Sequence, residues 1–120
     1  MHLDGLRDLC LAKPGATEGL PFGPDALVFK VRGKMFALTN LARLPPTVAL
    51  KCDPERALDL RERFAGIAPA WHMNKRHWNG VELQSDVPDA LIRGLLDHSY
   101  SLVVASLPRR DRDGLSSPEA

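Results

Sequence analysis

The chain has 120 residues and a formal net charge of +1, and 44% of its residues are hydrophobic. This length is typical of one domain with a single core and is too short for two domains. No apolar run reaches the ~20 residues that a membrane-spanning helix needs, and the first residues do not resemble a signal peptide. We therefore expect a cytoplasmic protein without a membrane partner, whose two cysteines stay reduced.

Charge is distributed unevenly along the chain. Residues 26–52 hold five Lys or Arg and no acid, and residues 63–81 hold three and no acid. The acids gather instead near the start, in residues 53–62 and in residues 86–97. If the fold keeps these segments apart, a nearly neutral chain has a strong positive field on part of its surface.

The first segment predicts a helix and then a loop. Apolar residues at helical spacing favour a helix over residues 3–13, which the Pro-Gly pair at 14–15 ends. Residues 14–24 are rich in proline and glycine and predict a loop. An aromatic side chain in such a loop usually anchors it, so we expect Phe22 to pack into the core.

Alternating and β-branched residues then predict strands. Segments 27–31 and 35–39 flank the tripeptide 32–34 and favour a β-hairpin, since the central glycine of that turn can take a positive φ. Residues 47–51 predict a third strand that continues the antiparallel meander. The tip of the hairpin is basic.

A second helix is predicted immediately after the third strand. Asp53 is placed as an N-cap, Pro54 suits the first helical position because its missing N–H costs nothing there, and Glu55 lies near the positive end of the helix dipole. Helical spacing predicts a buried stripe on this helix made of Ala57, Leu58, Arg61 and Phe64.

The remainder predicts a second hairpin and a long helix. Segments 68–71 and 80–84 favour extended strands, with the connection between them in residues 72–79. Apolar residues at spacings of three and four predict a helix that starts at 86–89 and continues past residue 103. After Pro108 the composition favours a mobile tail.

Together these elements predict an α+β fold, an antiparallel sheet with helices packed on one face. We expect a single domain over residues 1–108 and a mobile C-terminal tail over residues 109–120. The opposite face of the sheet and the tips of its hairpins should be exposed to solvent, and the two basic segments should lie at hairpin turns.

The segment 72–79 is poor material for a core, because it holds cations, histidines, amides and an indole without any carboxylate. Burying such groups without partners costs several kilocalories per mole each, so we expect them at a surface that faces an anion. The candidate binding residues in the two basic segments are Lys30, Arg32, Lys34, Lys51, His72, Asn74, Lys75, Arg76, His77 and Asn79. Trp71 and Trp78 could stack on a base or roof the core.

Catalytic readings find little support in the sequence. His72 and His77 are five residues apart, which does not match the spacing of a zinc-binding pair, so we expect no metal. Cys52 could gain a lowered pKa at a helix start, but no partner base is defined. No serine or glycine motif of a hydrolase, a phosphate loop or a dinucleotide site is present. We therefore predict no catalytic residue and no cofactor, and a binding protein is favoured over an enzyme.

Several motifs resemble the MmcQ/YjbR family in the same order along residues 6–110. They are Pro21-Phe22-Gly23 with 27–31, Gly33-Lys34-Met35-Phe36-Ala37-Leu38, 50–55, 72–79 and 97–108. The resemblance implies a CyaY-like fold with two wing-like hairpins, and DNA binding. Arg32 stands where the family is associated with a small residue, which adds charge to the turn. The iron chemistry of CyaY is not carried over, because the first helix holds only Asp4 and Asp8 as acids.

Three functions remain open from the sequence. The favoured one is binding of nucleic acid, with duplex DNA as the partner, through the basic hairpins. The second is a binding module or enzyme for a small anionic ligand, bearing phosphate or carboxylate, near residues 72–79. In that case Phe22, Trp71 or Trp78 should wall a concavity in which cations converge. The third is an acidic protein partner. The oligomeric state is not fixed by any of these patterns.

Overall fold

The computed structural model describes residues 1–70 and 73–115, which form four helices and one six-stranded sheet. In chain order the elements are α1 (Leu3–Leu11), β1 (Ala16–Gly19), β2 (Ala26–Val31), β3 (Lys34–Asn40), β4 (Thr47–Lys51), α2 (Pro54–Arg63), β5 (Ile67–Pro69), β6 (Trp78–Glu82), α3 (Asp89–Ala105) and α4 (Arg109–Asp113). None of the helices in the described part of the chain is long and apolar enough to cross a membrane.

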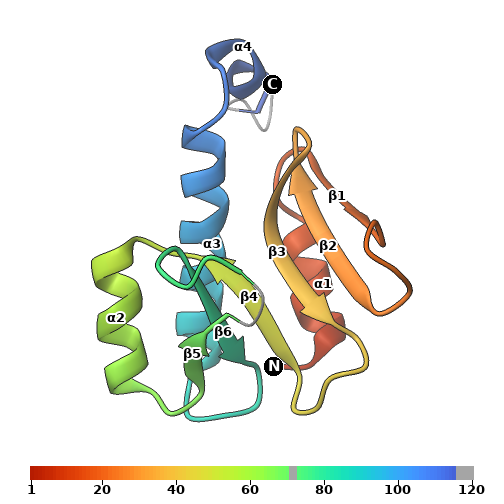
Figure 1. Ribbon diagram of the computed structural model, residues 1–120. Helices are drawn as coiled ribbons and strands as arrows, with labels where there is room; N and C mark the ends of the chain where they lie inside the picture. The colour runs from red at the N-terminus through yellow and green to blue at the C-terminus, as the bar shows by residue number, and fades with distance from the viewer. Residues whose placement is uncertain (71–72, 116–120) are drawn as a thin grey trace.

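The sheet is antiparallel throughout, in the order β1-β2-β3-β4-β6-β5 (Figure 1). Both predicted hairpins and the strand at 47–51 are confirmed. The β2–β3 turn is tight, with φ of 50° at Arg32 and 82° at Gly33, so both residues take the left-handed conformation that glycine adopts at little cost. The edge strand β1 was missed, because residues 16–19 were assigned to the loop.

The helices α1, α2 and α3 pack against one face of the sheet, as predicted, and their buried side chains form a single core with Phe29, Phe36, Val48 and Val81. Helix α3 lies across the middle strands and is fixed there by a fully buried hydroxyl. Ser99 donates to the carbonyl oxygen of Phe36 at 2.6 Å and accepts from the Lys51 N–H at 2.9 Å. One side chain thus joins α3 to two neighbouring strands.

Helix α2 begins where the sequence predicts. Asp53 is its N-cap and its carboxylate accepts a hydrogen bond from the Arg56 N–H at 3.3 Å, while Pro54 occupies the first turn. The predicted stripe is partly wrong, because the side chain of Leu58 is 59% exposed and Leu60 is buried in its place. The helix is therefore rotated relative to the prediction, and Ala57 and Leu60 face the core.

The chain beyond Pro108 is folded through residue 115, so the predicted boundary of a mobile tail at 108 is wrong for this part. Residues 109–113 form α4, and the side chain of Leu115 is buried against the core. A Cβ added at Gly15 would lie 2.5 Å from Leu115 Cδ2, which shows how closely the chain end packs on the α1–β1 turn. Residues 116–120 lie outside the described part.

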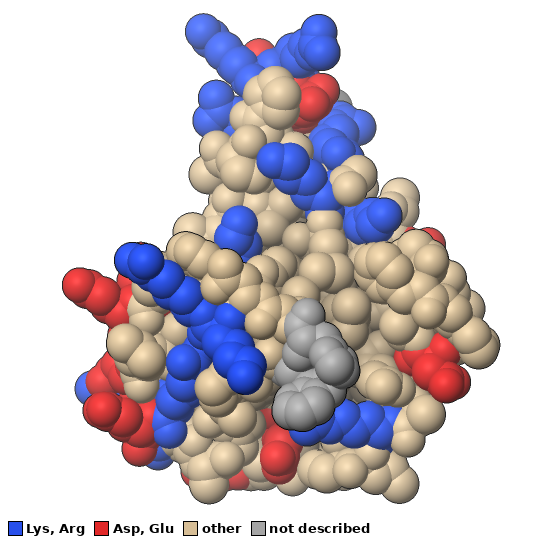
Figure 2. Space-filling view, viewed as in Figure 1, with Lys and Arg blue, Asp and Glu red and all other residues tan. Residues whose placement is uncertain are grey.

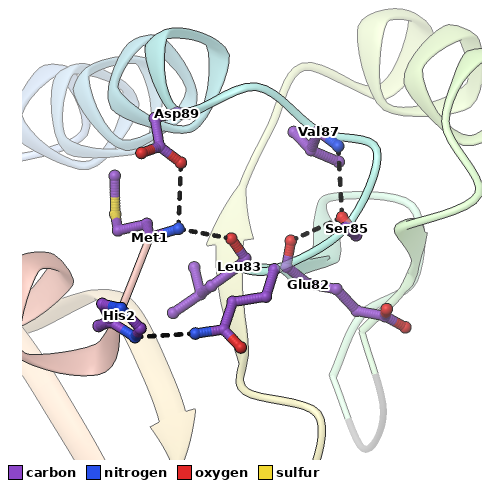
Figure 3. A network of polar contacts seen from close by, with 8 residues as sticks. Met1, His2, Glu82, Leu83, Ser85, Val87 and Asp89 are labelled. Carbon is purple, nitrogen blue, oxygen red and sulfur yellow. Dashed lines mark hydrogen bonds and ion pairs between the residues drawn. The ribbon is translucent and has the colours of Figure 1, made fainter.

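The start of the chain is held against the segment that leads into α3 (Figure 3). The Met1 amino group donates to the carbonyl oxygen of Leu83 at 2.9 Å and forms an ion pair with Asp89 at 3.1 Å. Beside it, His2 and Gln84 are hydrogen-bonded at 2.9 Å. These contacts connect α1 to the far end of β6, at the end of the sheet opposite the β2–β3 turn.

The second face of the sheet is not covered by a helix. Pairing in register places on this face the side chains that alternate with the core residues. Toward one end of the strands they include Lys30, Lys51 and Trp78, and in the middle they are small, Ala49 and Gly80. We call this surface the open face.

Candidate functional site

The antiparallel register brings the two basic segments to the same end of the sheet. Ala37, Leu50 and Asn79 form one row across β3, β4 and β6. Lys34 precedes Ala37 by three residues, and Arg76 precedes Asn79 by three residues. Because β3 and β6 run in the same direction, both residues lie toward the same end of the sheet. The strands β3 and β6 are two strand spacings apart, about 10 Å. We call this end, with Lys30, Arg32, Lys34, Lys51, Lys75 and Arg76, the basic end.

In the described part of the chain, the six cations of the basic end form no close ion pair. Arg32 Nε donates to the carbonyl oxygen of Asp111 at 3.3 Å, and Lys34 Nζ contacts Ser106 Oγ at 3.4 Å. Neither contact is made with a carboxylate, although the α4 residues beside Arg32 include Asp111 and Asp113 as well as three arginines.

Three arginines that the sequence reading assigned to a tail extend this surface. Arg109, Arg110 and Arg112 are exposed on α4, which the Arg32 and Lys34 contacts hold next to the β2–β3 turn. Figure 2 shows the Lys and Arg side chains gathered over α4 and the β2–β3 turn, and again toward α2, with tan surface between the two groups. The local signal that could have revealed α4 is Pro108, because proline is tolerated at a helix start.

The turn before β6 is held rigidly by α2. Arg61 Nε donates to Asn79 Oδ1 at 2.7 Å, and its Nη2 donates to the carbonyl oxygen of Lys75. Asn79 Nδ2 in turn donates to the carbonyl oxygen of Ala57 at 3.2 Å. Within the turn, Asn74 Oδ1 accepts from the Arg76 N–H at 3.0 Å. We call the bonds of Arg61 to Asn79 and to the Lys75 carbonyl oxygen the Arg61 clamp. The clamp fixes the position of the turn that carries Lys75 and Arg76.

Two of the predicted binding residues have other roles. Asn79 is 2% exposed and both of its polar atoms are bonded inside the protein, so its assignment to a ligand surface is wrong. Asn74 uses its side-chain oxygen to shape the turn, and no hydrogen bond between described residues uses its Nδ2. These roles could not be predicted locally, because the partner Arg61 lies on α2, 18 residues before Asn79 in the chain.

The remaining candidates are split between the open face and the undescribed residues. Trp78 pairs with Lys51 across β6 and β4 and is partly exposed on the open face, where an indole beside a cation can stack on a base. His77 is partly exposed in the turn next to it. Trp71 and His72 lie outside the described residues.

The thiol alternative is contradicted by burial. Cys52 is 4% exposed, and burial raises the pKa of its thiol despite the nearby Arg56 and Arg61 guanidinium groups. A nucleophilic cysteine needs the opposite shift. Burial raises the pKa of Cys10 to about 12, so this thiol is also inert. Both cysteines are unpaired, as predicted for reduced core residues.

One histidine outside the predicted set has a defined protonation state. His98 on α3 accepts a hydrogen bond at Nε2 from the Asp53 N–H at 3.1 Å, which only an unprotonated nitrogen can do. Burial lowers the pKa of His98, and the neighbouring Arg56 lowers it further, while Asp53 opposes them. The neutral imidazole of His98 therefore stabilises the start of α2 in the folded protein.

The open face carries a concavity, but it differs from the one predicted for a small anion. A hollow of about 770 Å³ is lined by Phe22, as predicted, yet Phe22 is 70% exposed, so its expected place in the core is wrong. Among the described residues, the cations of the basic end do not line it. Its one charged lining residue is Arg43, and the others are Ala26, Met35, Leu38, Asn40, Thr47, Ala49, Ala70, Met73 and Gly80.

Comparison with known proteins identifies the family. The model of the family described as YjbR matches residues 11–102, which contain all six strands and most of α3. The chain belongs to the YjbR family. Among its YjbR relatives, the uncharacterized protein YbdF of Escherichia coli O157:H7 is 41% identical over 106 residues, 88% of this chain and 87% of the relative. The uncharacterized protein YjbR of Escherichia coli strain K12 is 37% identical over 112 residues, 93% and 95% of the two chains.

Solved structures of similar proteins share the YjbR fold described above. The crystal structure of the Deinococcus radiodurans protein DR2400 has a TM-score of 0.88 and 39% identity, and the match covers 94% of this chain and 86% of that one. A crystal structure of a Pseudomonas syringae protein has a TM-score of 0.74 at 28% identity, covering 85% and 98%. These names state no ligand and no reaction, so the function of this YjbR protein has to come from its own geometry.

Proposed function

We propose that this YjbR protein is a cytoplasmic nucleic-acid-binding protein that holds duplex DNA at its basic end. The observation that carries the proposal is the register, which places Lys34 and Arg76 beyond the same row of the sheet although 41 residues separate them in the chain. Two basic turns at one end of one sheet, with no close ion pair among the described residues, can contact one polyanion together.

The spacing of these charges suits a duplex. The strands β3 and β6, which adjoin these two turns, are about 10 Å apart across the sheet. A duplex carries one phosphate charge per ~1.7 Å of axis when both strands are counted, so about six charges fall within that distance. The basic end offers six cations of its own, and α4 adds three arginines. Affinity in this arrangement comes from the release of condensed counterions and depends steeply on salt.

The side chains divide into those that bind the backbone and those that reach a base or sugar. The lysines and arginines of the basic end are assigned to phosphates. Asn74 Nδ2 and His77 are assigned to hydrogen bonds with phosphate, sugar or a base edge, and Trp78 to stacking on an exposed base. Because the backbone contacts dominate, the proposal is a protein of low sequence specificity.

The test is fluorescence anisotropy with a labelled 20-base-pair duplex at 50 and 200 mM salt. Backbone binding through six contacts predicts a loss of about 10³ in affinity between the two conditions. Weaker binding of a labelled acidic peptide of equal length separates DNA from an acidic protein partner. Absence of binding to the duplex at 50 mM salt with ~100 µM protein would exclude the proposal, since even non-specific DNA binding reaches about that range.

A further inference from the structure

None of the six cations of the basic end is among the described residues that line the hollow on the open face, although Met35 and Met73 lie next to that end. The rim of the hollow at the opposite end of the sheet is built from two loops, residues 20–25 and 41–46, which the bond from the Leu41 N–H to the Asp25 carbonyl oxygen joins at 2.6 Å. Phe22 stands on one loop and Arg43 on the other. The floor is the middle of the sheet, where Ala49 and Gly80 allow close approach to the strands.

The size and composition of the hollow are those of a small-molecule site. Its volume of about 770 Å³ lies within the ~300–1,000 Å³ usual for ligand pockets. The lining is largely apolar, and Met35 and Met73 line the same hollow as the aromatic ring of Phe22. Thioethers adapt their shape and make favourable contacts with aromatic rings, so a flat aromatic body suits this lining.

The polar groups of the lining set the charge of the ligand. No acid is among the described lining residues, and no hydrogen bond or ion pair between described residues uses the Arg43 guanidinium. Asn40 Oδ1 accepts from the Ala42 N–H at 2.9 Å, which leaves its Nδ2 as a donor beside the hollow. A guanidinium and an amide donor at the edge of an apolar hollow match a carboxylate.

We propose that the hollow binds a small aromatic carboxylic acid, whose ring lies on the floor at Ala49 and Gly80 and whose carboxylate contacts Arg43 and Asn40. This site shares Phe22 and Met73 with the small-anion site expected near residues 72–79, but it takes its charge from Arg43 and not from that segment. It makes no use of the basic end, so it gives the protein a second, separate ligand.

The test uses 1-naphthoate as the probe and 1-naphthalenemethanol as its neutral analogue, followed by amide chemical shifts in the full chain. We expect naphthoate to shift the signals of Ala49 and Gly80 and to bind about tenfold more tightly than the alcohol. Arg43→Gln should remove that advantage, because a charge-assisted bond of this kind contributes about tenfold. Arg93→Gln, an exposed arginine on α3, is the matched control and should leave it unchanged.

A variant that fills the hollow tests its location. A Cβ at Gly80 would meet Thr47 Cγ2 at 3.5 Å and the Ala68 carbonyl oxygen at 3.8 Å, which are ordinary contacts, so Gly80→Val should fold and should abolish binding of both probes. Ala49→Leu is a second filling variant with the same expected result. Unchanged binding in a folded filling variant, or an equal affinity for acid and alcohol in the natural chain, overturns the proposal. Naphthoate binding should survive the double change Lys75→Ala with Arg76→Ala. Failure of the naphthoate proposal can therefore be distinguished from failure of the DNA proposal.

Discussion

Removal of Lys75 and Arg76 together should flatten the salt dependence of DNA binding. Both side chains are exposed on the turn that the Arg61 clamp presents, and the clamp uses only the backbone of Lys75. Their replacement by alanine therefore deletes two phosphate contacts and keeps the turn in place. The effect can be worked out from the number of contacts that remain.

With six phosphate contacts, log affinity against log salt has a slope of about −5.4, and with four it is about −3.6. Between 50 and 200 mM salt the natural chain should lose a factor of roughly 2,000, whereas the double variant should lose roughly 150. Anisotropy titrations of one labelled duplex at four salt concentrations give both slopes. The free energy of unfolding, measured by urea titration, should not change by more than ~0.5 kcal/mol because both side chains are on the surface.

The matched control removes two positive charges at the other end of the molecule. Arg63 ends α2 and Arg93 lies in the first half of α3, and both are exposed. Arg63→Ala with Arg93→Ala changes the net charge by the same amount but should leave the slope near −5.4. An equal flattening in both double variants would show that net charge alone matters, and an unchanged slope in Lys75→Ala with Arg76→Ala would refute the assignment of these residues.

Three further outcomes follow from single contacts. Arg61→Ala should weaken DNA binding and lower the unfolding free energy by about 1–3 kcal/mol, since it leaves the buried Asn79 amide short of a partner; calorimetry and anisotropy on the same sample check both. His98 has its ordinary pKa of ~6.5 in the unfolded chain and a lowered pKa in the folded chain, so protonation favours the unfolded chain. The stability contributed by neutral His98 should therefore be full above pH ~6.5 and should be lost as the pH falls through the lowered folded pKa. His98→Gln should reduce this part of the pH dependence of urea midpoints, and an unchanged profile would remove the role of the Asp53 contact. Both thiols should react with a disulfide reagent only in denaturant, so rapid labelling of Cys52 in buffer would contradict its burial.

The parts of the fold that could be predicted are those fixed by local chemistry. Asp53 and Pro54 determine where α2 starts, and the glycine at 33 determines the β2–β3 turn, because each acts through its own backbone. Strand β1 could not be predicted, since it has only four residues and three of them are exposed. Its extended conformation is stabilised by pairing with β2 and not by its own composition. Helix α4 was missed because its five residues are all charged and its position depends on the distant β2–β3 turn.

The candidate site shows the same division between local and distant causes. The residue types of the basic end and its place at hairpin turns followed from the sequence, because alternation and turn residues locate hairpins. The role of Asn79 did not follow, since its polar atoms are bonded by a helix that begins 25 residues earlier. Phe22 was predicted as a wall of a concavity, but the floor of the hollow could not be foreseen, because it depends on small side chains meeting across β4 and β6.

The two borders of the sheet differ in their capacity to accept a strand from another molecule. On the β5 side only three residues are extended, Pro69 has no N–H to donate, and the Ile67 N–H is already used by the Phe64 carbonyl oxygen at 3.2 Å. On the β1 side, Glu18 carries a charge that Arg7 holds in place at 2.7 Å. Within the described residues, the β5 edge therefore offers poor hydrogen-bond donors, so pairing of strands between copies of this protein is favoured at β1 over β5.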